Sequence, residues 1–239
     1  MTNEIKINIP VTEADFKKAG DKMAFNIGLN LTIGGQVTVS SGAVDAIAEA
    51  VAGSTGGATF WDTSENATTL SNGATVNIGS NTYNASEGAI NVTDVTQITT
   101  AIDKSIPADI YFVMKIASDT AYQLMNSTGS QALGNCVAGS SNTSLGNEPA
   151  GAAPYYKNGV AFSGTTQGEL HTFYTTNSKI VVSLRGTQRP SFFNNLSRLL
   201  PGVAGAGNLL ADVVIVDAQD DAGADAIEAQ LAARHGITL

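Results

Sequence analysis

Residues 110–116 read IYFVMKI, and this run does most to decide the fold. It is apolar at consecutive positions apart from Lys115, and it is rich in β-branched and aromatic residues. Such a run is typical of a strand buried on both faces, so it predicts a central position in a sheet. A second apolar run, ADVVIV at residues 211–216, predicts another strand.

Weaker patterns surround these strands. Alternation predicts a strand at 4–9, and Gly34-Gly35 joins two strand-like runs within 24–40. Thr12 and Asp15 resemble a capping box that opens a short helix through about Gly20. Further helices are expected at about 43–52, 94–104, 119–126 and 191–200.

The last third contains two better-defined elements. The runs ELHTFYT and KIVVSL flank Thr176-Asn177-Ser178 and predict a hairpin over 169–184. A C-terminal helix is expected from Ala222 to Arg234, with Asp221 as its cap and Gly236 beyond its end. The predicted fold class is therefore α+β, mainly antiparallel β in a sandwich or barrel-like sheet, with a few short helices.

The chain is expected to form one assembly domain over 1–239. Asn-Gly, Gly-Ser and Glu-Gly pairs punctuate 53–92, which makes a small β lobe possible there. Residues 127–153 lack periodicity and carry only one charged side chain, Glu148. A loop of this length is unusual in a compact domain, so we expect an arm that packs between subunits.

The composition excludes several classes of function. The net charge is −9, and no Lys, Arg or His lies between Lys22 and Lys104. Nucleic-acid affinity depends on Lys and Arg, so sequence-specific nucleic-acid binding is not expected. No apolar run of twenty residues predicts a membrane span. Glu4 and Asn8 interrupt the stretch that a signal peptide would keep apolar, so we expect a chain made and kept inside a cell.

Four basic residues lie close together in the sequence: Lys179, Arg185, Arg189 and Arg198. They span a predicted strand, turn and helix, which favours half of an ion-pair interface with an adjacent copy over an anion site. We therefore predict that at least one of them meets a carboxylate of another subunit.

An acidic segment near the C-terminus has part of the spacing of a calcium-binding loop. The candidate oxygen ligands are Asp217, Gln219, Asp221, Asp225 and Glu228. The sixth position, which needs Gly for a sharp turn, is Ala222. An acidic helix N-terminus explains the same residues. No catalytic residue, cofactor or other metal site is predicted, because Cys136, His171 and His235 have no visible partners in the sequence.

Residues 180–187, IVVSLRGT, resemble the strand and turn of class 3 lipases, where an apolar strand ends in Arg-Gly-Thr. Membership would imply a G-x-S-x-G elbow further along the chain, with the serine exposed as nucleophile. No G-x-S-x-G occurs anywhere in the chain. A hydrolase-like or calcium-binding module is thus the alternative function. An apolar strand that ends in a glycine turn accounts for the motif without that function.

In composition, the chain resembles a bacteriophage virion structural protein such as a tail-tube or capsid-decoration subunit. It is rich in Ala, Gly, Ser, Thr and Asn and poor in charge. This resemblance implies a non-enzymatic role, copies of itself and other virion proteins as partners, and a place in the virion after assembly in the host cytoplasm. In a tail tube, acidic residues that face the lumen would repel DNA, so that DNA passes through the tube without binding to it.

Overall fold

The computed structural model describes residues 18–19, 22–23, 45–55, 57–65, 68–93, 98–103, 107–117, 119–127, 132–146, 155–187, 194–203 and 206–239. The chain divides into two compact units, residues 1–42 and residues 43–239, and the second is called the body below. In the first unit, β1 (Lys18–Ala19) pairs antiparallel with β2 (Lys22–Met23). Lys18 and Ala19 were expected at the end of a short helix, and the strands predicted at 4–9 and 24–40 lie outside the described residues.

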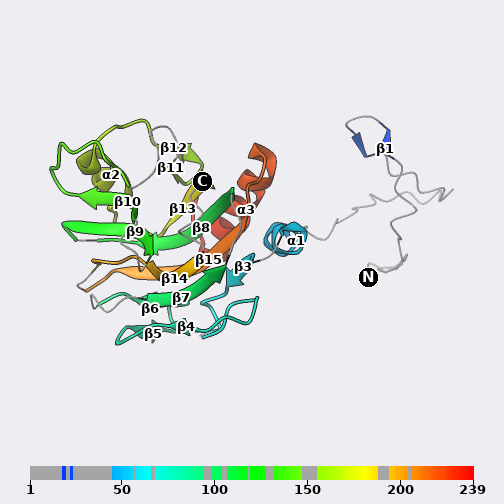
Figure 1. Ribbon diagram of the computed structural model, residues 1–239, viewed down its shortest axis with the longest axis horizontal. Coiled ribbons are helices and arrows are strands. Elements are labelled where there is room, and N and C mark those ends of the chain that lie inside the picture. The colour runs from blue at the N-terminus through cyan, green and yellow to red at the C-terminus, as the bar shows by residue number, and fades with distance from the viewer. Residues whose placement is uncertain are drawn as a thin grey trace, which may run out of the picture. The chain divides into compact units, whose positions relative to one another are not determined.

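The body is built on two antiparallel sheets, which confirms the α+β class (Figure 1). The larger sheet has the order β12-β11-β13-β8-β15-β6-β5, and β3 also pairs with β15. Its strands are β3 (Thr59–Trp61), β5 (Thr82–Asn84), β6 (Ala89–Asn91), β8 (Ala108–Lys115), β11 (Tyr155–Lys157), β12 (Val160–Ala161), β13 (Ile180–Thr187) and β15 (Leu209–Asp217). The smaller sheet has the order β10-β9-β14-β7-β4. Its strands are β4 (Val76–Asn77), β7 (Ile98–Asp103), β9 (Ala121–Ser127), β10 (Ala132–Val137) and β14 (Asn194–Leu199).

The side chains of β8 face two different cores, which explains why its sequence is apolar at consecutive positions. Ile110, Phe112 and Met114 pack with residues of the smaller sheet, whereas Tyr111 and Val113 pack under helices. Successive side chains of a strand point to opposite faces, so a strand between two layers has no polar face. The central position predicted for this strand is confirmed, since β13 and β15 flank it.

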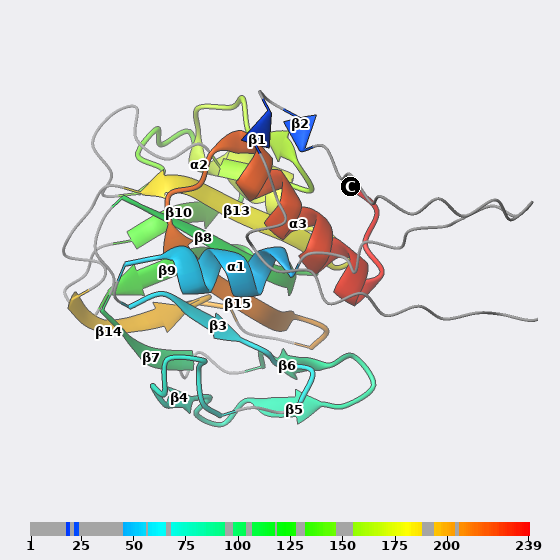
Figure 2. The ribbon, with the colours of Figure 1, turned by 90° about the vertical axis from the view of Figure 1, so that its right-hand side faces the viewer.

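Two helices cover the outer face of the larger sheet (Figure 2). They are α1 (Ala46–Gly53) and α3 (Asp221–His235). Ile47 of α1 and Ile227 and Leu231 of α3 are buried against the sheet. The Gln230 side chain joins the helices, accepting from the Ile47 amide at 3.0 Å and donating to Asp45 at 2.8 Å.

The C-terminal helix was well predicted from its end signals. Its N-cap is Asp220, one residue before the expected Asp221, and the Asp220 carboxylate accepts from the Gly223 amide at 2.8 Å. Gly236 closes the helix with φ +64°, a conformation that glycine adopts at little cost.

The predicted hairpin over 169–184 is wrong. Residues 167–174 form α2 (Gln167–Tyr174), and only the second half of the hairpin is a strand, β13. Thr166 and Glu169 make a reciprocal capping box, in which the Glu169 side chain accepts from the Thr166 amide at 2.9 Å. Leu170 and Tyr174, four residues apart, are buried on one side of the helix.

Three predicted helices are also wrong. The segment 98–103 is β7, 121–127 is β9 and 194–199 is β14, and these three strands adjoin one another in the smaller sheet. β14 pairs with β7 across about a hundred residues of sequence, as in Leu199 opposite Ile98. Long-range pairing and burial override a weak local helix preference.

The two segments considered as a lobe and an arm both contribute to the sheets. Within 53–92, β3, β5 and β6 belong to the larger sheet and β4 to the smaller one. Within 127–153, β10 forms an edge of the smaller sheet, and the following residues pack on α2 of the same chain. There the Gln167 side chain donates to the Ser144 carbonyl at 2.7 Å, so the described part of the expected intersubunit arm is held by its own body.

Candidate functional site

The basic residues predicted to lie at an interface are, where the structure describes them, paired within the chain. Lys179 lies 3.0 Å from the Glu87 carboxylate and also donates to the Glu87 carbonyl at 2.6 Å. Arg185 meets carboxylates of α3, as set out below. Arg189 and the side chain of Arg198 lie outside the described residues. The two described cations therefore have partners without a neighbouring subunit.

Arg185 lies at an irregularity of β13, where the register with β8 shifts between Leu184 and Thr187. A β-bulge re-aims side chains, and here it directs the guanidinium toward α3. Nη2 lies 2.6 Å from Glu228 and 2.9 Å from Asp225. The guanidinium also stacks 4.2 Å from the centre of the Tyr156 ring.

This Arg185 network is largely removed from water. The Arg185 side chain is 11% exposed and that of Glu228 is 1% exposed. Glu228 also accepts from the Ser183 hydroxyl at 2.5 Å. Burial acts to lower the pKa of Arg185, but the hydrogen bonds to Glu228 and Asp225 outweigh it and hold that pKa above its ordinary value. The network joins α3 to β13 of the larger sheet.

A second buried network forms at the irregularity of β15, where the register with β8 shifts between Ala211 and Val213. The intervening Asp212 is fully buried. It accepts from the Thr63 amide at 3.0 Å, and it lies 2.8 Å from Arg234 Nε and 3.0 Å from His235 Nε2. Burial acts to raise the pKa of Asp212. The hydrogen bonds from His235 and Arg234 lower that pKa by more than burial raises it, so the pKa is below the ordinary value of an Asp side chain.

The acidic segment considered for calcium does not converge on a shared point. Asp217 accepts from the Thr55 amide at 2.7 Å, on the side of α1. The Gln219 side chain donates to the Asp217 carbonyl at 2.7 Å, while Asp221, Asp225 and Glu228 surround Arg185. No group of three His, Cys, Asp or Glu side chains suited to a metal ion occurs within the described ranges.

The lipase-like motif IVVSLRGT forms β13. Its serine, Ser183, is fully buried and donates to Glu228. β13 pairs antiparallel with β8 and with β11. Gly186 has φ +66° and donates its amide to Asp109 at 2.6 Å, which makes the end of the motif a structural turn.

Cys136 and His171 are packed inside the body. Burial raises the pKa of the Cys136 thiol to about 12, which keeps the sulfur protonated and unreactive. His171 lies on α2 and contacts the Asp119 carbonyl at 2.7 Å. None of the described helices has the length and apolar character of a membrane span.

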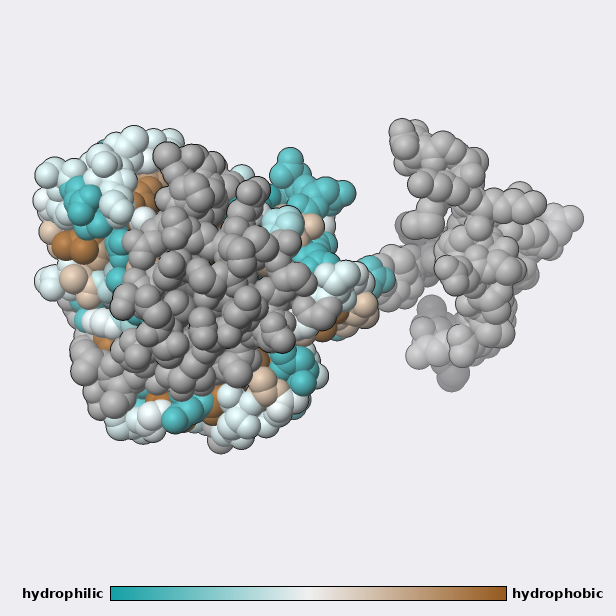
Figure 3. All heavy atoms as spheres, in the orientation of Figure 1, coloured by the Kyte–Doolittle hydropathy of each residue, from teal (hydrophilic) through white to brown (hydrophobic). Residues whose placement is uncertain are grey.

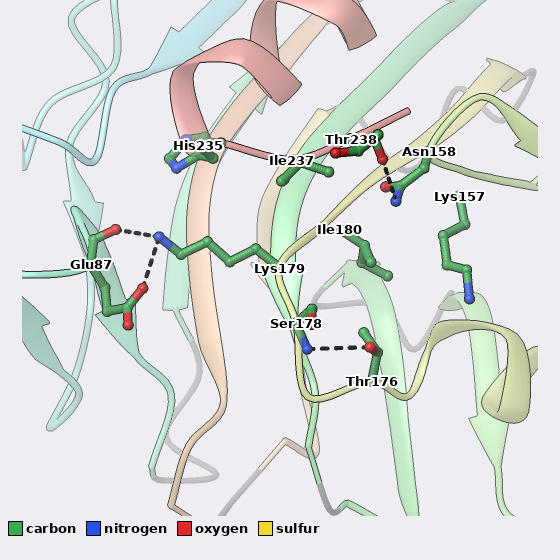
Figure 4. A pocket seen from close by; sticks show the side chains of 11 residues that line it. Glu87, Lys157, Asn158, Thr176, Ser178, Lys179, Ile180, His235, Ile237 and Thr238 are labelled. Carbon is green, nitrogen blue, oxygen red and sulfur yellow. Dashed lines mark hydrogen bonds and ion pairs between the residues drawn. The ribbon is translucent and has the colours of Figure 1, made fainter.

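Figure 4 shows a polar pocket of about 510 Å³ beside the C-terminus of α3. Its two lysines are already engaged, Lys179 with Glu87 and Lys157 with the Phe173 carbonyl. Asn158, in the turn between β11 and β12, donates to the Thr238 carbonyl at 3.4 Å and accepts from the Val181 amide at 2.8 Å. These contacts fasten the chain end to the sheet.

A larger and more apolar groove of about 770 Å³ lies at the free edge of the larger sheet. One wall is β12 and the residues after it, the second is α2, and the third is the turn after β10. Its apolar lining comes from Val160, Ala161, Phe162 and Phe173. Among the described residues that line it, Glu169 is the one with a charge. Figure 3 shows small apolar areas among polar residues on the side of the body that carries α2 and β10.

We name this feature the edge groove: Gly139–Ser141, Val160–Gly164 and the outer side of α2. Val160 is 62% exposed, and β12 is the terminal strand of its sheet. Sequence analysis missed the groove because residues 169–175 were expected to be a strand. Two local clues were present: the Asn158-Gly159 pair, a two-residue hairpin signal, and Thr166 with Glu169 three residues later, a capping-box signal.

Searches of protein-family models, curated proteins and solved structures found no match to this chain. The functional argument therefore rests on the residues and their geometry.

Proposed function

We propose that this chain is a non-enzymatic structural subunit of a homo-oligomeric assembly, and that the assembly is a bacteriophage virion. The observation that carries the proposal is the edge groove, where an apolar surface adjoins a terminal strand. An open sheet edge is a template for pairing with another chain, and native proteins protect it by keeping the edge strand short, charged or covered. Here the edge strand β12 is short, but both of its residues, Val160 and Ala161, are exposed and uncharged.

The placement of charge supports the same proposal. Arg185, Arg234 and Lys179 form ion pairs inside the body, and two of the carboxylates involved, Asp212 and Glu228, are fully or almost fully buried. The Arg185 and Arg234 pairs join α3 to the larger sheet and give the subunit internal rigidity. Much of the remaining surface is uncharged and polar, as expected of a protein that is covered by its neighbours.

Within a virion, the chain would serve in the tail tube or as a capsid decoration, bound to copies of itself and to other virion proteins. The composition favours these roles, and the net charge of −9 suits a surface past which DNA moves without binding. The hydrolase alternative has less support, because the chain has no G-x-S-x-G sequence to supply an exposed nucleophilic serine.

The oligomeric state of the purified full chain tests this proposal. Sedimentation velocity over a wide range of protein concentrations, with negative-stain electron microscopy, is expected to show rings, tubes or other closed oligomers. A monomer at every concentration would contradict the proposal. Turnover of a short-chain ester that is lost in His171→Ala or Cys136→Ala would establish the hydrolase alternative instead.

A further inference from the structure

The edge groove has the features of a site for an added β-strand. In antiparallel pairing, the backbone N–H and C=O groups of successive residues point alternately toward the partner strand and away from it. β12 pairs with β11 through Lys157 opposite Val160 and Tyr156 opposite Ala161, across the two-residue turn Asn158-Gly159. The next amide, of Phe162, donates back to Tyr155 at 2.7 Å. The Ala161 amide and carbonyl between these bonded positions therefore point to the open edge.

The groove beside this edge can accept apolar side chains. Val160 stands exposed on β12, and the Phe162 and Phe173 rings lie 5.3 Å apart between β12 and α2. Both rings are partly buried against the main core, so the floor is fixed rather than loose. A strand that adds to an edge gains affinity from main-chain hydrogen bonds and specificity from pockets for alternate side chains.

The chain contains a segment that matches this site. Residues 4–9 read EIKINI, and Ile5, Ile7 and Ile9 alternate so that a strand would carry all three on one face. Lys6 would lie on the opposite face of that strand, directed away from the groove.

The distribution of charge also favours the N-terminal unit, residues 1–42, as the source of the segment that binds the edge groove. Residues 1–42 contain four Lys and four Asp or Glu, so their net charge is zero. Residues 43–239 contain eight Lys or Arg and seventeen Asp or Glu, so the whole net charge of −9 lies on the body. Two bodies repel each other, whereas a neutral segment approaches a body without that repulsion.

We infer that the edge groove of one copy binds residues 4–9 of a second copy as an added β-strand next to β12. The inference rests on the proposed homo-oligomeric function and assigns its contact surface. The chain that connects residues 4–9 to their own body is long enough to reach the groove of a second copy. Its 36 residues, from 10 to 45, span up to roughly 120 Å when extended.

Disulfide cross-linking of the full chain tests this contact. Ile7→Cys and Val160→Cys are prepared as separate variants, with a mass tag on one of them, then mixed and oxidised. A heterodimer is expected within minutes. The native Cys136 is buried and stays reduced. The matched control pairs Ile7→Cys with Asn72→Cys, an exposed position outside the groove, and should give at least tenfold less heterodimer.

A backbone variant probes the strand geometry. Ala161→Pro removes an amide that points away from β11, so the body should stay folded while heterodimer formation falls at least tenfold. Emission of the buried Trp61 reports the fold. Equal cross-linking at positions 72 and 160 would overturn the inference. The Ile7→Cys/Val160→Cys double variant tests for a contact within one chain. A cross-link that forms within this variant but never between copies would also overturn the inference.

Sedimentation of the unmodified chain separates this inference from the proposed function. If the chain assembles but positions 7 and 160 do not cross-link between copies, the groove assignment fails and the assembly stands. If the chain is a monomer and no heterodimer forms, both fail.

Discussion

Replacing Arg185 with methionine should destabilise the body far more than the loss of a surface charge. The change leaves Glu228, 1% exposed, without its cationic partner. Removing one member of a buried ion pair costs about 3–5 kcal/mol in the free energy of unfolding. For a body of this size, that loss corresponds to a decrease in melting temperature of roughly 6–20 °C.

Urea unfolding followed by the emission of Trp61 measures this cost, since Trp61 is the single tryptophan and is fully buried. All variants need one fixed protein concentration, because assembly shifts apparent stability. The matched control is Lys179→Met, whose partner Glu87 is 44% exposed, and it should cost about 0–1 kcal/mol.

The double variant Arg185→Met/Glu228→Leu distinguishes two causes of destabilisation. One is the loss of the attraction between Arg185 and Glu228, and the other is the burial of an unpaired Glu228 carboxylate. Replacing both members of a buried pair with apolar residues is often nearly neutral. Two atoms of this pair, Arg185 Nε and Glu228 Oε2, find no hydrogen-bond partner among the described residues, so the native network is itself incompletely satisfied. We expect the double variant to recover to within about 2 kcal/mol of the native chain. A single variant that loses under about 1 kcal/mol, or a double variant that loses the sum of the two single changes, would refute this reasoning.

Three further predictions follow from the same structure. The lowered pKa of Asp212 stabilises the fold above the ordinary pKa of about 4, and this stabilisation is lost as the pH falls through the lower folded value. Asp212→Asn should thus flatten the acid limb of a stability-against-pH curve, and an unchanged limb would contradict the assignment. Cys136 should resist a thiol-reactive dye at pH 8 and react on addition of denaturant, whereas rapid labelling of the native chain would show an accessible thiolate. Thr166→Ala removes the N-cap of α2 and should lower stability by about 0.5–2 kcal/mol in the urea assay, while Thr166→Ser should preserve most of it.

The sequence by itself determined the elements whose signals are local and strong. The run at 110–116 identified the central strand, because a strand between two layers has no polar face to interrupt the apolar pattern. The C-terminal helix could be placed to within a residue or two, since an acidic N-cap and a left-handed glycine satisfy the orphan groups at its ends. The mainly antiparallel α+β class followed from these elements.

Only the tertiary structure decided the smaller sheet, α2 and the site. The strands β7, β9 and β14 have ambiguous local patterns and become strands because distant partners bury them, as Leu199 does opposite Ile98. Residues 169–174 looked extended in sequence, but the Thr166 capping box and the burial of Leu170 and Tyr174 favour a helix. The bulges that turn Arg185 and Asp212 toward α3, and the edge groove between β12 and α2, depend on register and packing between segments far apart in the chain. No pattern within one segment encodes such a juxtaposition, which is why the site emerged only from the fold.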